Sequence, residues 1–282
     1  MTSSLILSLT TFAYLLCTVL YLSGVIFRCK PLLFLGTLAG AATLITQTVG
    51  LGLRWRESYQ LGYGHAPLSN LYESLVFASW AIMLIYLVFE SRSKQRALGI
   101  FPSLFSFLAM AYASFSKDMD SKIQPLLPAL KSNWLIAHVI TCFLGYAAFA
   151  VSFGLSVLYI VRKAIPDNPT PHTGLLAAVP NAKQLEAFNY QMILFGFLWL
   201  SVGIITGSIW ANSAWGTYWS WDPKETWSLI TWLIYAALLH ARTMKGWQGP
   251  RIAWLSMFGF GCVLFTYFGV NFLLSGLHSY AR

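Results

Sequence analysis

Eight long apolar stretches, separated by short polar connections, constrain this chain more than any other feature of its sequence. Each stretch is near the ~20 residues that a helix needs to cross the hydrocarbon core of a bilayer. Backbone polar groups in lipid must be satisfied within the segment, which favours helices. The stretches cover residues 5–27, 31–53, 70–90, 98–116, 133–161, 190–210, 226–244 and 252–276. The sequence therefore predicts an all-α fold, a polytopic membrane helix bundle of about eight transmembrane helices.

The composition supports the same fold class. Of the 282 residues, 57% are hydrophobic and 10% are charged, whereas about a quarter of a soluble domain is charged. We therefore expect residues 1–282 to form a single integral membrane domain. The formal net charge of +9 would suggest a nucleic-acid ligand in a soluble protein, but in a membrane protein basic residues are topology signals.

Basic residues gather in alternate connections between the stretches. The clusters are Arg28 and Lys30; Arg92, Lys94 and Arg96; Arg162 and Lys163; and Arg242, Lys245 and Arg251. By the positive-inside rule these connections are cytoplasmic, or stromal in a plastid. Both termini then lie on the opposite side, called the p-side here. We interpret the first stretch as a retained helix because residues 1–4 carry no positive charge. The proline-containing segment 162–189 is predicted as a cytoplasmic linker loop, with a short surface helix near Ala182 to Phe188.

The cysteines indicate neither a disulfide framework nor a zinc site. Cys17, Cys29, Cys142 and Cys262 form no CxxC pair, and three of them lie in apolar stretches. We expect buried, small apolar side chains, and none is placed as a nucleophile.

A tryptophan-rich segment precedes the seventh stretch. Residues 215–227 hold four tryptophans and a tyrosine. Asp222, Pro223 and Glu225 have the spacing of an N-cap, a first helical position and a reciprocal capping box. Residues 211–226 are therefore predicted as a p-side loop that leads into a helix. An interfacial aromatic belt is one interpretation, but so many indoles beside a glycine and an acid favour a platform for a large flat apolar ligand.

The string WGTYWSWDPKETW at residues 215–227 resembles the WWD signature of haem-handling proteins. Its DPKETW form resembles the CcsA (ResC) family of system II cytochrome c biogenesis. Residues 65–74, HAPLSNLYES, are similar to a PLSNLYES-type stretch of the same family, and Asn70 and Glu73 there have capping-box spacing. The resemblance covers essentially the whole chain. It implies haem delivery across the membrane and covalent attachment of haem to the CxxCH thiols of apocytochrome c on the p-side.

The resemblance also implies particular haem ligands. His138 and His278 match the axial ligands of an outer haem, and His240 matches a ligand of an inner haem within the membrane. The residues themselves fit, because two neutral imidazoles can bind iron on opposite faces of a haem. His240 lies eighteen residues after Asp222, about 27 Å along a regular helix, so it belongs to a separate site. The haem-binding loop comprises Trp215, Gly216, Trp219, Trp221, Asp222, Pro223, Lys224 and Glu225.

Other polar residues are weaker candidates. His65 and Glu73 are secondary site residues, and His65 is not expected to be a ligand. His172 is interpreted as a solvated loop residue. No catalytic residue is assigned beyond those that position haem, because the reactive chemistry belongs mainly to haem and thiols.

The resemblance implies a partner of the CcsB (ResB, Ccs1) type, with which the chain would form the haem-handling subunit of a holocytochrome c synthase, a thioether-forming lyase. Because only one histidine lies within a stretch away from the p-side, the second inner ligand would come from that partner. Haem b would be substrate and bound ligand, and apocytochrome c and thiol-reducing proteins would be further partners. The membrane is the bacterial inner membrane or the thylakoid membrane.

Two other functions use similar features. A di-haem b-type electron-transfer subunit also binds haem through histidines, but it needs pairs of in-span histidines at both depths. A small-molecule transporter could use the tryptophan segment as a gate, but it leaves His138 and His278 unexplained.

Overall fold

The structure, a computed structural model, describes residues 2–117, 119–164, 178–274 and 276. Over these residues the chain is helical, with short connections and no strand. The main helices are α1 (Ser3–Ile26), α2 (Lys30–Gln60), α3 (Leu71–Ser93), α4 (Ile100–Phe115), α5 (Asn133–Ala164), α6 (Ala182–Trp215), α7 (Pro223–Met244), α8 (Pro250–Leu264) and α9 (Val270–Leu273). A π-helical turn, Phe265–Gly269, joins α8 to α9.

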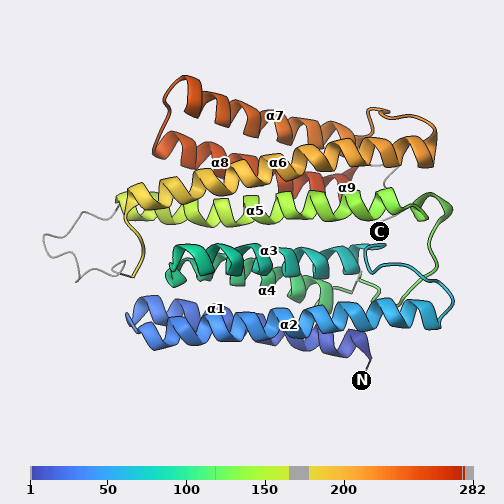
Figure 1. The fold of residues 1–282 in the computed structure, drawn as a ribbon, viewed down its shortest axis with the longest axis horizontal. Helices are drawn as coiled ribbons and strands as arrows, with labels where there is room; N and C mark the ends of the chain where they lie inside the picture. The colour runs from blue at the N-terminus through green and yellow to red at the C-terminus, as the bar shows by residue number, and fades with distance from the viewer. Residues whose placement is uncertain (1, 118, 165–177, 275, 277–282) are drawn as a thin grey trace, which may run out of the picture.

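Seven helices of the described chain are long and apolar enough to cross a membrane by length and composition, the run from α8 to α9 counting as one. This confirms the predicted all-α membrane bundle, and the chain is an integral membrane protein. The predicted seventh span, 226–244, corresponds to α7, which lies outside this set. Helix α7 has 22 residues, a length within the range of the shorter spans, and it runs beside α6 and α8 (Figure 1). Its Trp, Tyr, Ser, Thr and His side chains make it less apolar than the seven spans.

Two predicted loops are shorter than expected because α6 is longer. The helix begins at Ala182, where the Asn181 side chain accepts a hydrogen bond from the backbone N–H of Gln184 at 2.9 Å. It ends at Trp215, where Gly216 adopts φ +78°. Residues 182–189, where a short surface helix was expected, are instead the first turns of α6. Residues 211–215 are helical instead of loop, and the tryptophan-rich connection is reduced to residues 216–222. Residues 162–164 likewise belong to α5.

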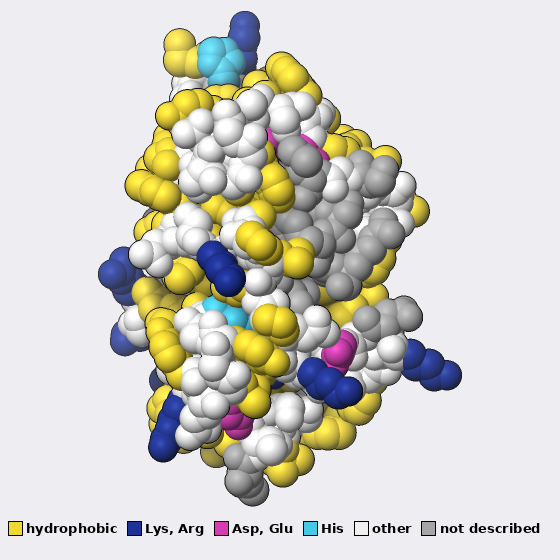
Figure 2. Space-filling view, turned by 90° about the vertical axis from the view of Figure 1, so that its right-hand side faces the viewer, with side chains coloured by type: hydrophobic (Ala, Val, Ile, Leu, Met, Phe, Trp, Pro, Cys, Tyr) yellow, Lys and Arg dark blue, Asp and Glu magenta, His cyan; other side chains and the backbone are white. Residues whose placement is uncertain are grey.

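The helices run side by side along the long axis of the molecule, so their connections gather at two ends (Figure 1). One end holds the connections that the sequence marks with basic clusters, such as those from α1 to α2 and from α7 to α8. The other end, called the site end here, holds residues 61–70, 116–132 and 216–222. Figure 2 views the site end, where acidic and basic side chains both appear among apolar ones.

Among the described helices, α5 and α6 pack against each other most extensively along their lengths. Gly196, Gly203 and Gly207 follow one another at spacings of seven and four along one face of α6. A Cβ on Gly203 would lie 2.6 Å from the Cys142 sulfur and 3.2 Å from the Cys142 backbone nitrogen. Small residues at such positions let helix backbones approach closely in membranes, where dispersion packing replaces the hydrophobic effect. This stripe therefore fixes the spacing of the two helices that carry the site.

We predict that Gly203→Ala lowers the thermal stability of the purified protein, because the new methyl group meets backbone as well as side chain. The cost of such overpacking is typically about 1–3 kcal/mol. Gly261→Ala in α8 is the matched control, because no atom lies within 4 Å of its Cβ position. An equal melting temperature for the two variants would contradict the close α5–α6 contact.

Candidate functional site

A cavity of about 170 Å³ opens at the site end between α3, α5, α6, α7 and the final span. Its polar lining combines one cation, one carboxylate, one imidazole and several hydroxyl and amide groups. These polar residues are Ser69, Asn70, Ser74, His138, Ser208, Lys224, Glu225, Ser228, Thr266 and Asn271. Apolar side chains such as Phe143 and Trp219 complete the wall. The cavity is smaller than the ~300–1,000 Å³ that encloses a drug-sized ligand, so the described walls can surround only part of a large flat one.

His138 lies on the first turns of α5, half-buried in the cavity wall. Its Nδ1 lies 2.8 Å from the Gly203 carbonyl oxygen. Because a carbonyl can only accept, Nδ1 carries the proton, and Nε2 of the neutral ring bears the lone pair. A Cβ on Gly207 would lie 2.6 Å from the imidazole, so glycine leaves the space that the ring fills. Both contacts fix the ring's orientation, which is how a second-layer carbonyl holds a metal-ligating histidine.

Trp210 is a site residue that the sequence analysis missed. Its ring is stacked on the His138 imidazole, with centroids 6.0 Å apart and an interplanar angle of 12°. It is 1% exposed, and its indole N–H donates to the Ala129 carbonyl oxygen at 3.0 Å. Leu130 and Leu135 pack around it. The helix pattern places Trp210 on α6, but only the tertiary structure brings the α4–α5 connection over it.

The tryptophans of the 215–221 segment do not form one platform. Trp219 lines the cavity. Trp215 is instead the last residue of α6 and packs edge-on against Trp210, with centroids 6.0 Å apart. Trp221 is 69% exposed, and its φ of +60° is rare for a bulky residue, so it marks a constrained turn. The structure therefore brings one of the three predicted tryptophans to the cavity and places the other two around it.

The predicted helix start is confirmed at α7. Asp222 is the N-cap, Pro223 follows it, and Glu225 completes a capping box. The Glu225 carboxylate accepts from the backbone N–H groups of Ser220 at 2.7 Å and Asp222 at 3.2 Å. Asp222 is 6% exposed, and its Oδ1 accepts from the Lys224 backbone N–H at 2.9 Å. The capping box thus ties both acids to the connection that carries Trp219.

Lys224 supplies the cavity's cation and lies just before the predicted span 226–244. Burial lowers its pKa from the ordinary value to about 8, and the neighbouring Asp222 carboxylate opposes part of that shift. The ammonium therefore stays largely protonated at neutral pH and can attract an anionic group of a ligand.

Cys142 also lines the cavity, and its sulfur lies 3.6 Å from His138 Nδ1.

The final span contributes an irregular helical turn to the cavity. The π-helical residues Thr266 and Tyr267, and Asn271 of α9, line it. Such turns are uncommon and occur often at functional sites because they re-aim side chains. Hydrophobic patterning predicted a regular span at 252–276 and carried no signal for this turn.

Of the secondary candidates, neither His65 nor Glu73 lines this cavity. Asn70 caps α3 by accepting from the Glu73 backbone N–H at 2.8 Å, as its spacing predicted. The Glu73 carboxylate, however, accepts from Ser69 and from Arg54. His65 is 6% exposed and bonded to backbone carbonyls.

The remaining histidines are separated from the cavity or not described. His240 lies in the same continuous α7 as the capping box, but its side chain is exposed on the bundle surface near the opposite end. His278 and His172 lie outside the described residues. Within the described part, no three His, Cys, Asp or Glu side chains form a metal-binding group.

A protein-family match and similar known sequences point to the same family. Residues 68–278 match the family described as cytochrome C assembly protein. The cytochrome c biogenesis protein CcsA of Guillardia theta is 40% identical, and the match covers 97% of this chain and 94% of that protein. The CcsA protein of Gloeobacter violaceus is 39% identical, with 95% and 93% coverage.

A solved structure shares the fold. Cytochrome c haem lyase CcmF aligns with a TM-score of 0.65 over 98% of this chain, at 18% sequence identity. At so low an identity, the likeness concerns the helical arrangement alone. The chain spans about half of CcmF, 48% of its length. The sequence relatives are matched over nearly their whole length. The chain therefore belongs to the CcsA family of cytochrome c biogenesis proteins.

Proposed function

We propose that the chain carries haem b across the membrane and holds it at the site end while haem is attached to the CxxCH thiols of apocytochrome c. The observation that carries the proposal is the His138 ring. Its Nδ1 is hydrogen-bonded to the Gly203 carbonyl, so the lone pair of the neutral ring is on Nε2, the atom that would bind iron axially. His278, outside the described residues, would supply the second axial ligand.

The residues around the cavity suit part of a haem. Trp219 and Phe143 offer apolar surface to the macrocycle, and Lys224 offers a cation to a propionate. The haem would supply the iron and four of its ligands, which is consistent with a site that holds no cluster of metal-binding side chains among the described residues. The capping box of Asp222 and Glu225 would hold the Trp219 connection in place.

The covalent step needs positioning from this chain. Each apocytochrome thiol adds across a haem vinyl group: a carbon–sulfur bond forms, and the thiol proton is transferred to the other vinyl carbon. The addition involves no net oxidation. Holding haem and peptide in one geometry converts a bimolecular encounter into an effectively unimolecular step. With a CcsB-type partner, the chain would act as the haem-handling half of a synthase.

His240 supports a second haem site shared with another chain. The side chain is exposed on α7, and a histidine that faces lipid without a partner is costly. A haem held between His240 and a ligand from the CcsB-type partner would satisfy the imidazole. The di-haem electron-transfer alternative is not favoured, because the CcsA relatives are matched over nearly their full length.

The first prediction from the proposed function concerns orientation in the membrane. The alternating basic connections favour an orientation in which the site end and both termini face the p-side. Reporter fusions at Gln95 and Ala164 should read cytoplasmic, and fusions at Asp120 and Arg282 should read external. A reversed result at any two positions rejects the orientation.

The second prediction concerns the outer haem. His138→Ala and His278→Ala should each abolish cytochrome c maturation while the protein still accumulates in the membrane. Exogenous imidazole should restore part of the activity, because it replaces the lost ligand. Full maturation in either alanine variant would show that the residue is not a required ligand.

The third prediction separates the two haems. His240→Ala should lower the haem content of the whole purified complex, because haem passes the inner site first. Trp219→Ala should deplete only the outer haem and leave the inner haem's reduced spectrum intact. Trp254→Ala, which removes a 58% exposed tryptophan of α8, is the control. Full haem and full maturation in His240→Ala would make His240 a structural residue.

A further inference from the structure

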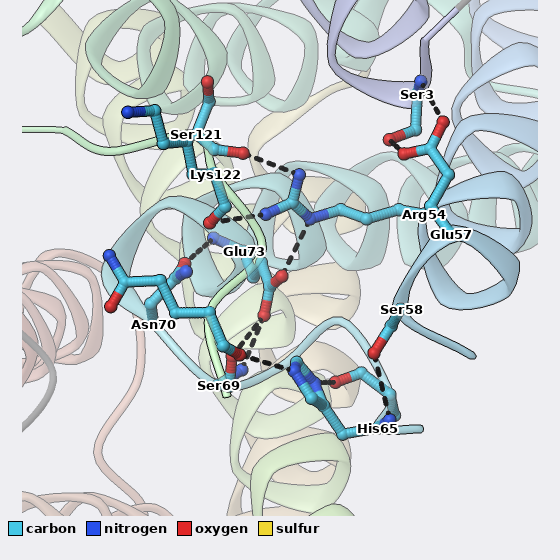
Figure 3. A network of polar contacts seen from close by, with 12 residues as sticks. Ser3, Arg54, Glu57, Ser58, His65, Ser69, Asn70, Glu73, Ser121 and Lys122 are labelled. Carbon is cyan, nitrogen blue, oxygen red and sulfur yellow. Dashed lines mark hydrogen bonds and ion pairs between the residues drawn. The ribbon is translucent and has the colours of Figure 1, made fainter. Parts of the chain in front are cut away.

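We propose that Arg54, Glu73 and His65 are positioning residues, which clamp two walls of the cavity, and that His65 does so as the imidazolium. These residues lie at the site end but outside the cavity lining. They connect the end of α2, the start of α3 and the α4–α5 connection (Figure 3). The clamp itself is independent of the proposed haem chemistry.

The centre of the clamp is a buried ion pair. Arg54 Nε lies 2.7 Å from Glu73 Oε1, and the two side chains are 2% and 1% exposed. The rest of the guanidinium reaches the α4–α5 connection: Nη1 donates to the Ser121 carbonyl at 2.8 Å, and Nη2 to the Lys122 carbonyl at 3.5 Å. A planar guanidinium can serve three acceptors in fixed directions, and a lysine ammonium cannot reproduce that fork.

Glu73 fixes the first cavity wall. Its second carboxylate oxygen accepts from the Ser69 backbone N–H at 2.8 Å and from the Ser69 hydroxyl at 2.7 Å. Ser69 and its neighbours Leu68 and Asn70 line the cavity directly. The carboxylate therefore bridges α2 to this wall. Removing one partner of a buried pair leaves an uncompensated charge, which is strongly destabilising.

His65 adds a contact whose chemistry limits its protonation state. Its Nδ1 lies 3.0 Å from the Ala66 carbonyl oxygen, and its Nε2 lies 2.9 Å from the Gln124 carbonyl oxygen. Carbonyl oxygens accept hydrogen bonds and never donate them, and a neutral imidazole has only one N–H. Both contacts are hydrogen bonds only when both nitrogens are protonated. In the neutral ring, one nitrogen lone pair would face a carbonyl oxygen.

The α4–α5 connection carries the clamp's effect to the second wall. The Gln124 carbonyl contacts His65 Nε2. Five residues later in the same connection, the Ala129 carbonyl accepts a hydrogen bond from the Trp210 indole. The next residue, Leu130, lines the cavity and packs on Trp210, which stacks on His138. The backbone carbonyls of residues 121, 122, 124 and 129 are all hydrogen-bonded by side chains of other elements. The longest interval between these carbonyls is the short segment from 124 to 129. The clamp therefore positions the indole that supports the His138 ring.

Hydrogen exchange of the purified, full-length protein tests the clamp without any haem. Arg54→Lys should speed amide exchange in residues 119–130 by at least about tenfold, since hydrogen bonds from charged donors contribute on that order. Arg56→Lys, two residues away and exposed, should leave the exchange unchanged. His65→Gln, a milder variant that keeps a neutral donor, should speed it as well. If both Arg54→Lys and His65→Gln exchange like Arg56→Lys, the clamp is rejected.

The imidazolium has its own readout. Nitrogen-15 spectra of the histidine-labelled protein, assigned with His65→Gln, should show two ring N–H groups for His65 at about pH 6. A single N–H for His65 at that pH would overturn the assignment of His65 as an imidazolium. Cytochrome c maturation in the same variants then reports separately on the proposed function.

Discussion

The close approach of α5 to α6 is the constraint on which the candidate site depends. Glycines at 196, 203 and 207 remove the side chains that would hold the two helices apart. The same face that allows this packing also provides the Gly203 carbonyl that orients His138 and the space beside Gly207 that its ring occupies. Packing and site geometry are therefore not separate here, because any change that widens the helix pair also releases the imidazole.

The tryptophan-rich segment has a different structural logic from the one its composition indicates. Four indoles in thirteen residues predicted one aromatic surface, but the segment contains a helix end, a constrained turn and a helix start. Trp215 completes α6 and supports Trp210, while Trp219 reaches the cavity. The acids use their carboxylates to hold this path, since Asp222 and Glu225 both accept backbone N–H groups. In this connection, the polar residues set the path of the backbone, and two aromatic residues, Tyr218 and Trp219, line the cavity.

Local signals in the sequence predicted the local structure well. Hydrophobic length gave the helices, and the spacings at Asn70 and Asp222 gave their N-caps, because both depend on residues near one another in the chain. The extension of α6 to Trp215 was not predicted, since the aromatic residues at 210 and 215 are compatible with helix or loop. Contacts between segments that are distant in the sequence could not be predicted either. Nothing local to Trp210 indicates that Ala129, 81 residues earlier, accepts its N–H, and nothing near Arg54 indicates the carbonyls at 121 and 122.

The continuous α7 sets how two haem sites in the proposed function could be related. Its 22 residues span about 33 Å at 1.5 Å per residue. At its start the helix is fixed by the buried Asp222 and at its end by Arg242, which lies 2.8 Å from Glu186 of α6. A helix anchored at both ends cannot bring His240 to the cavity by bending or sliding. Because His240 also faces outwards, haem bound there would lie on the bundle surface. In the proposed function, haem would then reach His138 by moving along an interface with another chain, while α7 keeps its position.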